Sequence, residues 1–444
     1  MIDTIRKYVK DKKVLLLGFG REGKSTLAIL RRGGGYEMIA VADRNPVEVD
    51  EDIKLICGPD YQKCLNDFDI IFKSPGIVLE MDVKDIKGLL VSQTELFFER
   101  YKNQIIGITG TKGKSTTTTL MHQILKSAGR DTVLAGNIGI PAFDIWEQIH
   151  EDTVITFEMS SHQLEYMTVA PKIAIYLNIH EEHLDHYGTM EKYVAAKENI
   201  YRNQKSGDVL FVNEQIVPGK ESCRADVVSV GYGEDADIKI SENVITYEGN
   251  RYVIPVEDIR LLGEHNYYNI AVAYGVMKQF KITDEEFTKG LCAYETLPHR
   301  LQYIGTVDGV KYYDDSISTI CDTAIQALNS VKDAAVILIG GMDRGIDYRE
   351  LIEFLSGHSI ENIVLMADTG RRIYEEIGSD YKDFVNPSRL HLVNTLEEAV
   401  ELAKKITPKG KSCVMSPAAA SYGIFKNFEE RGEVFNRLVH LERY

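Results

Sequence analysis

The chain has 444 residues, of which 44% are hydrophobic and 27% are charged. Domains commonly contain roughly 100–200 residues, so this length predicts two to four folding units. No apolar run approaches the roughly 20 residues that a membrane-spanning helix needs, and a formal net charge of −16 argues against a nucleic-acid partner.

The N-terminal segment and the cysteines bear on the cellular compartment. Residues 1–8 contain no apolar stretch followed by a small-residue cleavage site, which predicts a cytoplasmic protein. The six cysteines are scattered without a C-x-x-C pair, a pattern that disfavours both a zinc site and a disulfide framework. We expect them to be reduced.

The first segment opens with an apolar run at residues 14–17 that leads into Gly18-x-Gly20-x-x-Gly23. A second run, 38–42, ends at Asp43. Strand, glycine turn and acidic residue satisfy the dinucleotide fingerprint. The glycines require only a tight turn and a close approach to an anion, so NAD, another nucleotide and a purely structural turn all fit.

The second segment has the ingredients of a phosphate cradle. An apolar run at 105–109 precedes the loop 110–116, and a helix is expected over 117–128. Backbone N–H groups would wrap phosphates, Lys114 would supply a mobile charge, and Ser115 could bind magnesium. The strict Walker pattern needs glycine at position 108, where this chain has Ile108. Nucleotide binding is nevertheless favoured over a serine-capped glycine turn.

Polar residues follow two further strands of this segment. The run 154–157 ends at Glu158, and the run 173–177 ends at Asn178. Ligands bind beyond the carboxyl ends of parallel strands, so Glu158 could hold a metal ion, with a solvent-facing carboxylate as the simpler alternative. His183 lies in an acidic, histidine-rich stretch that is either a magnesium site or a solvated loop.

Two other positions have an ordinary structural interpretation. Lys197 lies in mid-helix, where sequence physics alone predicts a surface lysine. Asn266 and Asn269 open a helix containing residues 270–273, and Asn266 would serve as its N-cap at least as readily as it would bind a ligand.

The third segment begins near residues 297–300, where proline interrupts the pattern. Strands are expected at 311–313, 336–339, 363–366 and 413–415, and helices at 319–331 and 396–406. Each of the three segments thus starts afresh with a strand and alternates strands with helices. This rhythm predicts three parallel α/β units.

Ordered motifs along the whole chain resemble the Mur ligase family, and within it the branch that adds D-glutamate to UDP-N-acetylmuramoyl-L-alanine. The motifs are Ser74-Pro75-Gly76-Ile77, the loop 110–116, Gly136-Asn137-Ile138-Gly139, Glu158-Met159-Ser160-Ser161, Glu182-His183-Leu184-Asp185, Ala196-Lys197, Gly263-Glu264-His265-Asn266, Leu297-Pro298-His299-Arg300, Asp315-Ser316, Ser416-Pro417-Ala418 and Phe425-Lys426-Asn427-Phe428. The family's loop departs from the Walker pattern in the same way.

The resemblance implies three domains. Residues 1–98 would form a Rossmann-like UDP-substrate domain. Residues 99–297 would form a central P-loop mononucleotide-binding α/β domain, and residues 298–444 a Rossmann-like domain that binds the amino acid. It also implies a monomer that acts on small molecules.

The resemblance assigns residues to ATP and magnesium. The ATP set is Gly110, Thr111, Lys112, Gly113, Lys114, Ser115, Thr116, Asn266, Asn269, Arg300 and Asp315. Two magnesium ions would be held by Ser115, Glu158, His183 and Lys197, the last as a carbamate. Lys114, Glu158, His183 and Lys197 would be the catalytic residues.

The remaining assignments concern the other two substrates. The UDP-substrate set is Gly18, Gly20, Asp43, Arg44, Ser74, Gly76, Asn137, Ser160 and Gln163. The glutamate set is Thr319, Arg344, Ser421 and Phe428. Where many D-glutamate-adding relatives have lysine, this chain has Ile317. Arg344 could instead clamp the glutamate side chain.

The implied activity is ATP-dependent ligation through an acyl phosphate. The same ligation with L-glutamate or another amino acid is the alternative, together with a folate-branch sibling. A nicotinamide-dependent oxidoreductase is the remote alternative, raised by the turn at Gly18–Gly23.

Overall fold

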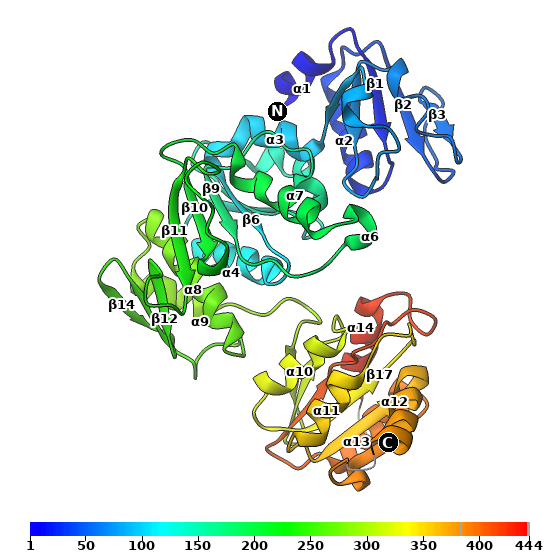
Figure 1. The fold of residues 1–444 in the computed structure, drawn as a ribbon, viewed down its shortest axis with the longest axis vertical. Helices are drawn as coiled ribbons and strands as arrows, with labels where there is room; N and C mark the ends of the chain where they lie inside the picture. Colours follow the sequence, from blue (N-terminus) through cyan, green and yellow to red (C-terminus); the bar gives the residue numbers. More distant parts are fainter. Residues whose placement is uncertain (382–383, 442–444) are drawn as a thin grey trace. The chain divides into compact units, whose positions relative to one another are not determined.

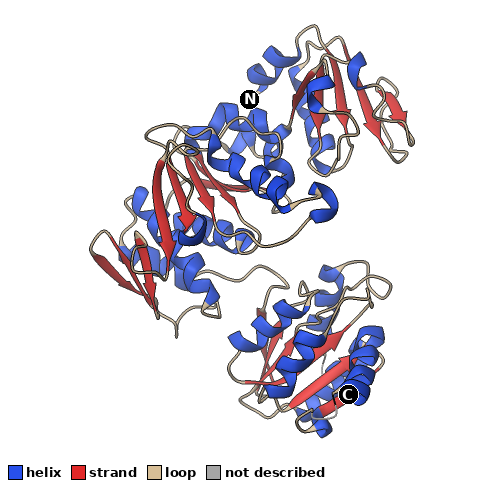
Figure 2. Cartoon of the chain, in the orientation of Figure 1, coloured by secondary structure: helices blue, strands red, loops and turns tan. Residues whose placement is uncertain are grey.

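The computed structural model describes residues 1–381 and 384–441. Within this part of the chain the strands form a five-stranded, a nine-stranded and a six-stranded sheet (Figures 1 and 2). The chain divides into two compact units, one of residues 1–256 with 267–293 and one of residues 257–266 with 294–444. The expected α/β class, with strands and helices alternating along the chain, is confirmed.

The first sheet is parallel, in the order β3-β2-β1-β4-β5. Its strands are β1 (Lys13–Leu17), β2 (Met38–Asp43), β3 (Lys54–Cys57), β4 (Ile70–Lys73) and β5 (Leu89–Val91), with helices α1 (Ile2–Val9) and α2 (Arg21–Gly33). The turn after β1 needs its glycines: Gly18 has φ of 91°, and a Cβ on Gly23 would lie 2.4 Å from the Gly18 carbonyl oxygen. Helix α2 can therefore begin directly above the strand end.

The second sheet has the order β14-β13-β12-β11-β10-β9-β6-β8-β7. Its strands are β6 (Ile105–Thr109), β7 (Thr132–Gly136), β8 (Val154–Glu158), β9 (Ile173–Tyr176), β10 (Val209–Asn213), β11 (Asp226–Gly231), β12 (Ile238–Ser241), β13 (Val244–Tyr247) and β14 (Asn250–Val253). The pairs from β7 to β12 are parallel, and β12, β13 and β14 pair antiparallel. Central β6 is buried along its whole length, as its unbroken apolar sequence predicts.

The helices of this region supply the residues that surround the ends of the central strands. They are α3 (Gln93–Tyr101), α4 (Lys114–Ser127), α5 (Ser161–Leu164), α6 (Leu184–Tyr187), α7 (Met190–Arg202), α8 (His265–Gln279) and α9 (Asp284–Cys292). On α3, the rings of Phe97 and Phe98 pack against Phe157 of β8 at centroid distances of 5.8 and 5.1 Å. This shared apolar core places the first two sheets in one compact unit. The domain boundary at residues 98 and 99 stays a prediction.

The third sheet has the order β15-β16-β20-β17-β18-β19. Its elements are β15 (Gln302–Val307), β16 (Val310–Asp314), α10 (Cys321–Ser330), β17 (Ala334–Gly340), α11 (Arg349–Gly357), β18 (Asn362–Met366), α12 (Ala367–Asp380), β19 (Leu390–Val393), α13 (Leu396–Ile406), β20 (Ser412–Met415) and α14 (Phe428–His440). Only β15 pairs antiparallel among its described strands.

Alternate side chains of the third sheet enter two separate cores. Ile363 and Leu365 of β18 pack with residues of α10, α11 and α12, whereas Val364 and Met366 pack with residues of α13 and α14. A strand buried on both faces reads as a continuous apolar run, which is why the sequence predicted it. No helix of the described residues is long and apolar enough to cross a bilayer.

Candidate functional site

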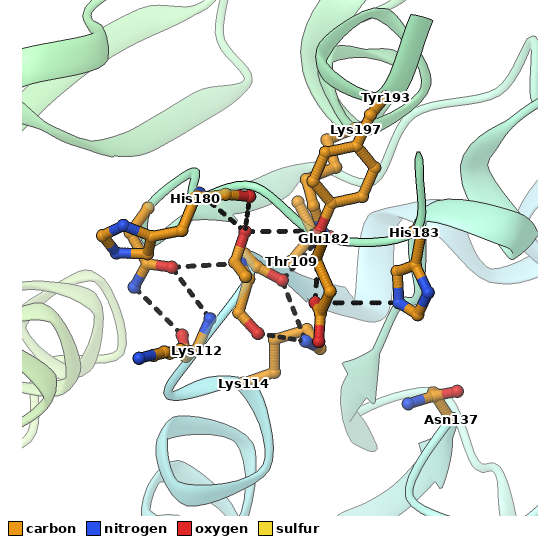
Figure 3. A network of polar contacts seen from close by, with 12 residues as sticks. Thr109, Lys112, Lys114, Asn137, His180, Glu182, His183, Tyr193 and Lys197 are labelled. Atoms are coloured by element: carbon orange, nitrogen blue, oxygen red, sulfur yellow. Dashed lines mark hydrogen bonds and ion pairs between the residues drawn. The ribbon is translucent and has the colours of Figure 1, made fainter. Parts of the chain in front are cut away.

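The loop between β6 and α4 has the geometry of a phosphate cradle (Figure 3). Gly110 and Gly113 have φ of 157° and 82°, so the loop uses backbone conformations that favour glycine. Helix α4 begins at Lys114, directly after this loop, and the N-terminus of a helix favours an anion. The expected strand, loop and helix are thus present in this order.

Asn178, which follows β9, fixes this loop. Its side-chain oxygen accepts hydrogen bonds from the backbone N–H groups of Thr111 (3.0 Å) and Lys112 (2.8 Å), and its amide donates to the Lys112 carbonyl at 3.0 Å. The sequence showed only that a polar residue ends the strand. The structure adds its role as the support of the loop.

Lys114 and Lys197 both reach the carbonyl of Gly110. The Lys114 Nζ donates to Gly110 O at 2.9 Å and to Thr111 O at 2.8 Å, and the Lys197 Nζ donates to Gly110 O at 2.7 Å. Lys197 also lies over the Tyr193 ring, 4.8 Å from its centroid (Figure 3). Two helices, α4 and α7, therefore direct ammonium groups at one end of the loop.

The interpretation of Lys197 as a surface lysine is wrong. The residue is 1% exposed because the inner face of α7 packs over β6 and β9. Burial, with the nearby charge of Lys114, lowers the pKa of Lys197 to about 7. A substantial fraction of this amine is neutral at neutral pH.

Glu158, the last residue of β8, is 2% exposed, so the solvent-facing alternative is wrong. One carboxylate oxygen accepts a hydrogen bond of 2.7 Å from the Asn137 side chain. The other is buried without a hydrogen-bond partner among the described residues. An unpaired buried carboxylate oxygen is costly unless a cation compensates it, and oxygen is the donor that magnesium prefers. Glu158 therefore fits a metal site.

His183 lies in the acidic stretch, as an exposed residue with φ of 56°. Its Nε2 is 3.6 Å from a carboxylate oxygen of Glu182, which also accepts a 3.4 Å hydrogen bond from the Tyr193 hydroxyl. The solvated-loop interpretation describes these residues well. Among the residues that the structure describes, no group of three or more His, Cys, Asp or Glu side chains is arranged to hold a metal ion.

The expected UDP-substrate residues of the first sheet meet at the carboxyl ends of its strands. The Ser74 hydroxyl donates to the Gly18 carbonyl at 3.1 Å. The two Asp43 oxygens accept backbone N–H groups of Phe19 and Asn45, both at 2.9 Å. Asp43 thus supports the glycine turn itself. Gly20 begins the turn of α2 as its N-cap, and Arg44 and Gly76 are exposed nearby.

Ser160 and Gln163 form a capping box at the start of α5. The Gln163 amide also donates to Glu22 of α2 at 2.9 Å. Both expected substrate residues therefore make hydrogen bonds that stabilise the fold. Gln163 joins α5 to α2, the helix that follows the first strand of the first sheet.

Lys73 was not anticipated from the sequence. It ends β4, is 6% exposed, and lines a small pocket with Ser92, His162, Gln163 and Tyr166. Its ammonium donates to the Pro75 carbonyl at 3.2 Å and lies 3.9 Å from a Glu165 oxygen. Burial lowers its pKa to about 8 despite that carboxylate. Lys73 could have been predicted from the sequence as a site residue, because it is a charged residue at the end of an apolar strand, as Glu158 is.

Asn269 of α8 contacts the phosphate loop directly. Its side-chain oxygen accepts a 3.2 Å hydrogen bond from Thr117, and it would lie 2.7 Å from a Cβ on Gly113. Asn266 is not the N-cap of α8, because the helix begins one residue earlier at His265. The Asn266 amide donates to the Leu262 carbonyl at 2.6 Å.

Asp315 follows β16 and is buried. It accepts hydrogen bonds from the Leu301 backbone N–H (3.0 Å) and the Ser416 hydroxyl (2.7 Å), and burial raises its pKa to about 6. Arg300, the other residue of this expected pair, is exposed in the turn before β15.

Three of the expected glutamate residues, Thr319, Arg344 and Ser421, lie on loops that follow β16, β17 and β20, and the fourth, Phe428, begins α14. The Arg344 guanidinium donates to the Thr319 carbonyl at 3.0 Å, which brings two of them together. The Phe428 carbonyl accepts a 2.8 Å hydrogen bond from the Ser316 hydroxyl, and Ser421 is buried in the loop after β20. None of the six cysteines, all of which the structure describes, is in a disulfide bond.

Parallel sheets with a glycine-lysine loop opening into a helix place the chain among α/β proteins of the P-loop class. Residues 108–277 match the family model of the Mur ligase middle domain. UDP-N-acetylmuramoylalanine–D-glutamate ligase from Clostridioides difficile strain 630 is 33% identical, over 97% of this chain and 99% of that protein. The proteins of the same name from Alkaliphilus metalliredigens and Clostridium botulinum strain 657 are 32% and 31% identical, each over 98% of its own length and 97% and 98% of this chain. The chain belongs to the Mur ligase family.

Solved structures share the fold. MurF from Acinetobacter baumannii superposes with a TM-score of 0.60 at 19% identity, covering 98% of this chain and 92% of that one. MurC from Thermotoga maritima gives a TM-score of 0.58 at 16% identity, covering 96% and 98%. Membership of this family leaves the nicotinamide alternative without support.

Proposed function

We propose that this protein is an ATP-dependent ligase that joins D-glutamate to UDP-N-acetylmuramoyl-L-alanine in peptidoglycan precursor synthesis, with release of ADP and phosphate. The observation that carries the proposal is the end-to-end similarity to ligases of that name, 33% identical over 97% of the chain for one of them. The phosphate cradle at residues 110–116 supports the ATP half of the reaction. We place the enzyme in the cytoplasm as a monomer, and light scattering would test the monomer.

The ATP phosphates would lie against the N-terminus of α4. Lys114 would neutralise charge on the transferring group after turning from the carbonyls that it now contacts. Asn269, packed against Gly113, would border the nucleotide. Asn266, Arg300 and Asp315 would complete the nucleotide contacts.

Magnesium would be held by Ser115, Glu158 and His183, with a carbamate on Lys197 completing two sites. The orphaned Glu158 oxygen supports the first part. The buried amine of Lys197 supports the second, because only a neutral amine attacks CO₂ and its pKa is lowered to about 7. Bound magnesium would neutralise the charge of the phosphates.

The reaction would begin with attack of the alanine carboxylate oxygen on the γ-phosphorus of ATP. The bond from phosphorus to the bridging oxygen breaks, ADP leaves, and an acyl phosphate forms. The glutamate amine then attacks the acyl carbon. The tetrahedral intermediate loses a proton from nitrogen and expels inorganic phosphate, which leaves the amide.

The UDP substrate would span the strand ends of the first sheet, near Gly18, Gly20, Asp43, Arg44, Ser74 and Gly76, and reach Asn137, Ser160 and Gln163. Asn137, which holds one oxygen of Glu158, would link this substrate to the metal site. The glutamate would lie among Thr319, Arg344, Ser421 and Phe428. The guanidinium of Arg344 suits the side-chain carboxylate because it can bind both oxygens.

Phosphate release from ATP in the presence of UDP-N-acetylmuramoyl-L-alanine, with D-glutamate compared against L-glutamate, tests the proposal. We expect release only when both the sugar peptide and D-glutamate are present. Release that needs neither would overturn the proposal. Ile317 stands where many D-glutamate-adding members of the family have lysine, so L-glutamate is the second candidate. Faster release with L-glutamate would favour it. Activity on a substrate without UDP would indicate the folate branch.

A further inference from the structure

The loop that carries Arg344 runs from Gly341 to Tyr348, between β17 and α11. It contains no helix or strand beyond an isolated bridge from Met342 to Ala420. Arg344 itself is exposed and contacts the Thr319 carbonyl through one guanidinium nitrogen. An irregular loop of this kind needs support from elsewhere to present a side chain in one position.

Arg372, in the second turn of α12, supplies that support at three points. One Nη donates to the Asp343 carboxylate at 2.7 Å, and the other donates to the Ile346 carbonyl. The guanidinium also lies over the Tyr348 ring, 4.9 Å from its centroid. Arg372 therefore contacts Asp343, which precedes Arg344, and Ile346 and Tyr348, which follow it.

The Asp343 carboxylate closes the loop from within. The oxygen that accepts from Arg372 also accepts the backbone N–H of Gly345 at 2.8 Å. Gly345 has φ of 71°, a conformation that favours glycine. Asp343 thus joins the residue on the other side of Arg344, Gly345, to the Arg372 guanidinium.

This arrangement differs from an ordinary surface ion pair. Both partners of the Arg372–Asp343 pair are 27% exposed, and Glu376 accepts from the Arg372 Nε at 2.9 Å. Partial burial and a fixed fork of donors make such contacts stronger and more directional than those of an exposed lysine. A lysine has a single nitrogen and no planar fork, so it would not reproduce these directional contacts.

We propose that Arg372 is a positioning residue for the amino-acid substrate. It holds the loop so that Arg344 faces the side-chain carboxylate of the incoming glutamate. Because the loop is already ordered, glutamate binding does not carry the entropic cost of ordering it. The proposal rests on the proposed function, since it assumes that Arg344 binds glutamate.

Steady-state kinetics of Arg372→Ala and Arg372→Lys tests the role, with Arg371→Ala as the matched control. Arg371 is the neighbouring arginine on α12, exposed, with a 3.2 Å hydrogen bond to Asn394. For both Arg372 variants we expect the KM for glutamate to rise about tenfold, with kcat at saturating glutamate and the KM for ATP little changed. Arg371→Ala should match the wild type.

An unchanged glutamate KM in Arg372→Ala would overturn the positioning role. A wild-type enzyme that releases no phosphate with the UDP substrate and glutamate would overturn the proposed function, and this inference with it. The assay of the wild type distinguishes these outcomes, because an active wild type supports the proposed function whatever the glutamate KM of Arg372→Ala.

Asp343→Asn is the second variant, and it keeps the test open if Arg372→Ala does not fold. It retains the size of the side chain but removes the charge that faces Arg372, so we expect the same selective rise in glutamate KM. In a folded Arg372→Ala background, Asp343→Asn should add little, because both changes break one contact. A fully additive effect on the glutamate KM would contradict the proposed contact.

Discussion

Lys197 donates a 2.7 Å hydrogen bond to the carbonyl of Gly110, although 87 positions separate the two residues in sequence. This contact places a buried amine at the base of the phosphate loop. We expect this buried amine to affect both the activity of the protein and the pH dependence of its stability.

Replacing Lys197 with alanine should nearly abolish phosphate release. The alanine variant lacks the amine on which a carbamate would form, and with it an anionic oxygen donor for magnesium. Added short carboxylic acids should partly restore activity by occupying the vacated space. Assays with and without acetate or formate measure this. Full activity of the unrescued variant would remove the carbamate from the mechanism.

Stability should depend on pH through the same residue. The unfolded lysine has an ordinary pKa of 10.5 and the folded one a pKa of about 7, so the unfolded chain binds more protons between these values. The contribution of Lys197 to the free energy of unfolding therefore rises with pH between about 7 and 10.5, and it falls again as the pH is lowered towards 7. Lys197→Met should flatten the rise.

Urea unfolding at several pH values between 7 and 10, in buffers free of CO₂, compares the two proteins. The difference between them isolates Lys197 from Lys73, whose pKa is also lowered. Parallel curves for wild type and Lys197→Met would contradict the expectation.

Glu158→Gln should separate stability from activity. The change removes a buried charge whose second oxygen has no partner among the described residues, so the melting temperature without magnesium should stay level or rise. Phosphate release should fall sharply and need more magnesium. Melting curves and a magnesium titration measure the two effects. Wild-type magnesium dependence would place the ion elsewhere.

Arg344→Ala should raise the KM for glutamate roughly tenfold to a hundredfold, because a bidentate contact with a carboxylate is lost. The KM for ATP should change little. Arg349→Ala is a suitable control, since Arg349 lies just after this loop and its ion pair among the described residues is with exposed Asp347. If the glutamate KM of Arg344→Ala equals that of the control, another residue binds the side chain.

Local sequence patterns determined much of the architecture. The runs at 105–109 and 396–406 became β6 and α13 with the expected bounds. The phosphate loop was also predicted from local sequence, namely from Gly110, Gly113 and Lys114. Apolar periodicity and glycine conformations act over a few residues, so they can be read from the chain directly.

Tertiary structure decided which polar residues are buried and what they contact. Lys197 had an ordinary mid-helix sequence, yet packing of α7 over β6 and β9 removes its ammonium from water. Partners from distant parts of the chain also decide the surroundings of three other residues: Asn178 contacts Thr111, Lys73 lies near Glu165, and Arg372 contacts Asp343. The antiparallel strands β13 and β14 also went unpredicted.

The sequence by itself thus determined the α/β class, the nucleotide loop and the family resemblance. The tertiary structure alone decided the environments of Lys197 and Glu158 and the support of the Arg344 loop. The physical reason is that desolvation and hydrogen-bond geometry depend on neighbours brought together from distant parts of the chain, and local patterns carry no record of those neighbours.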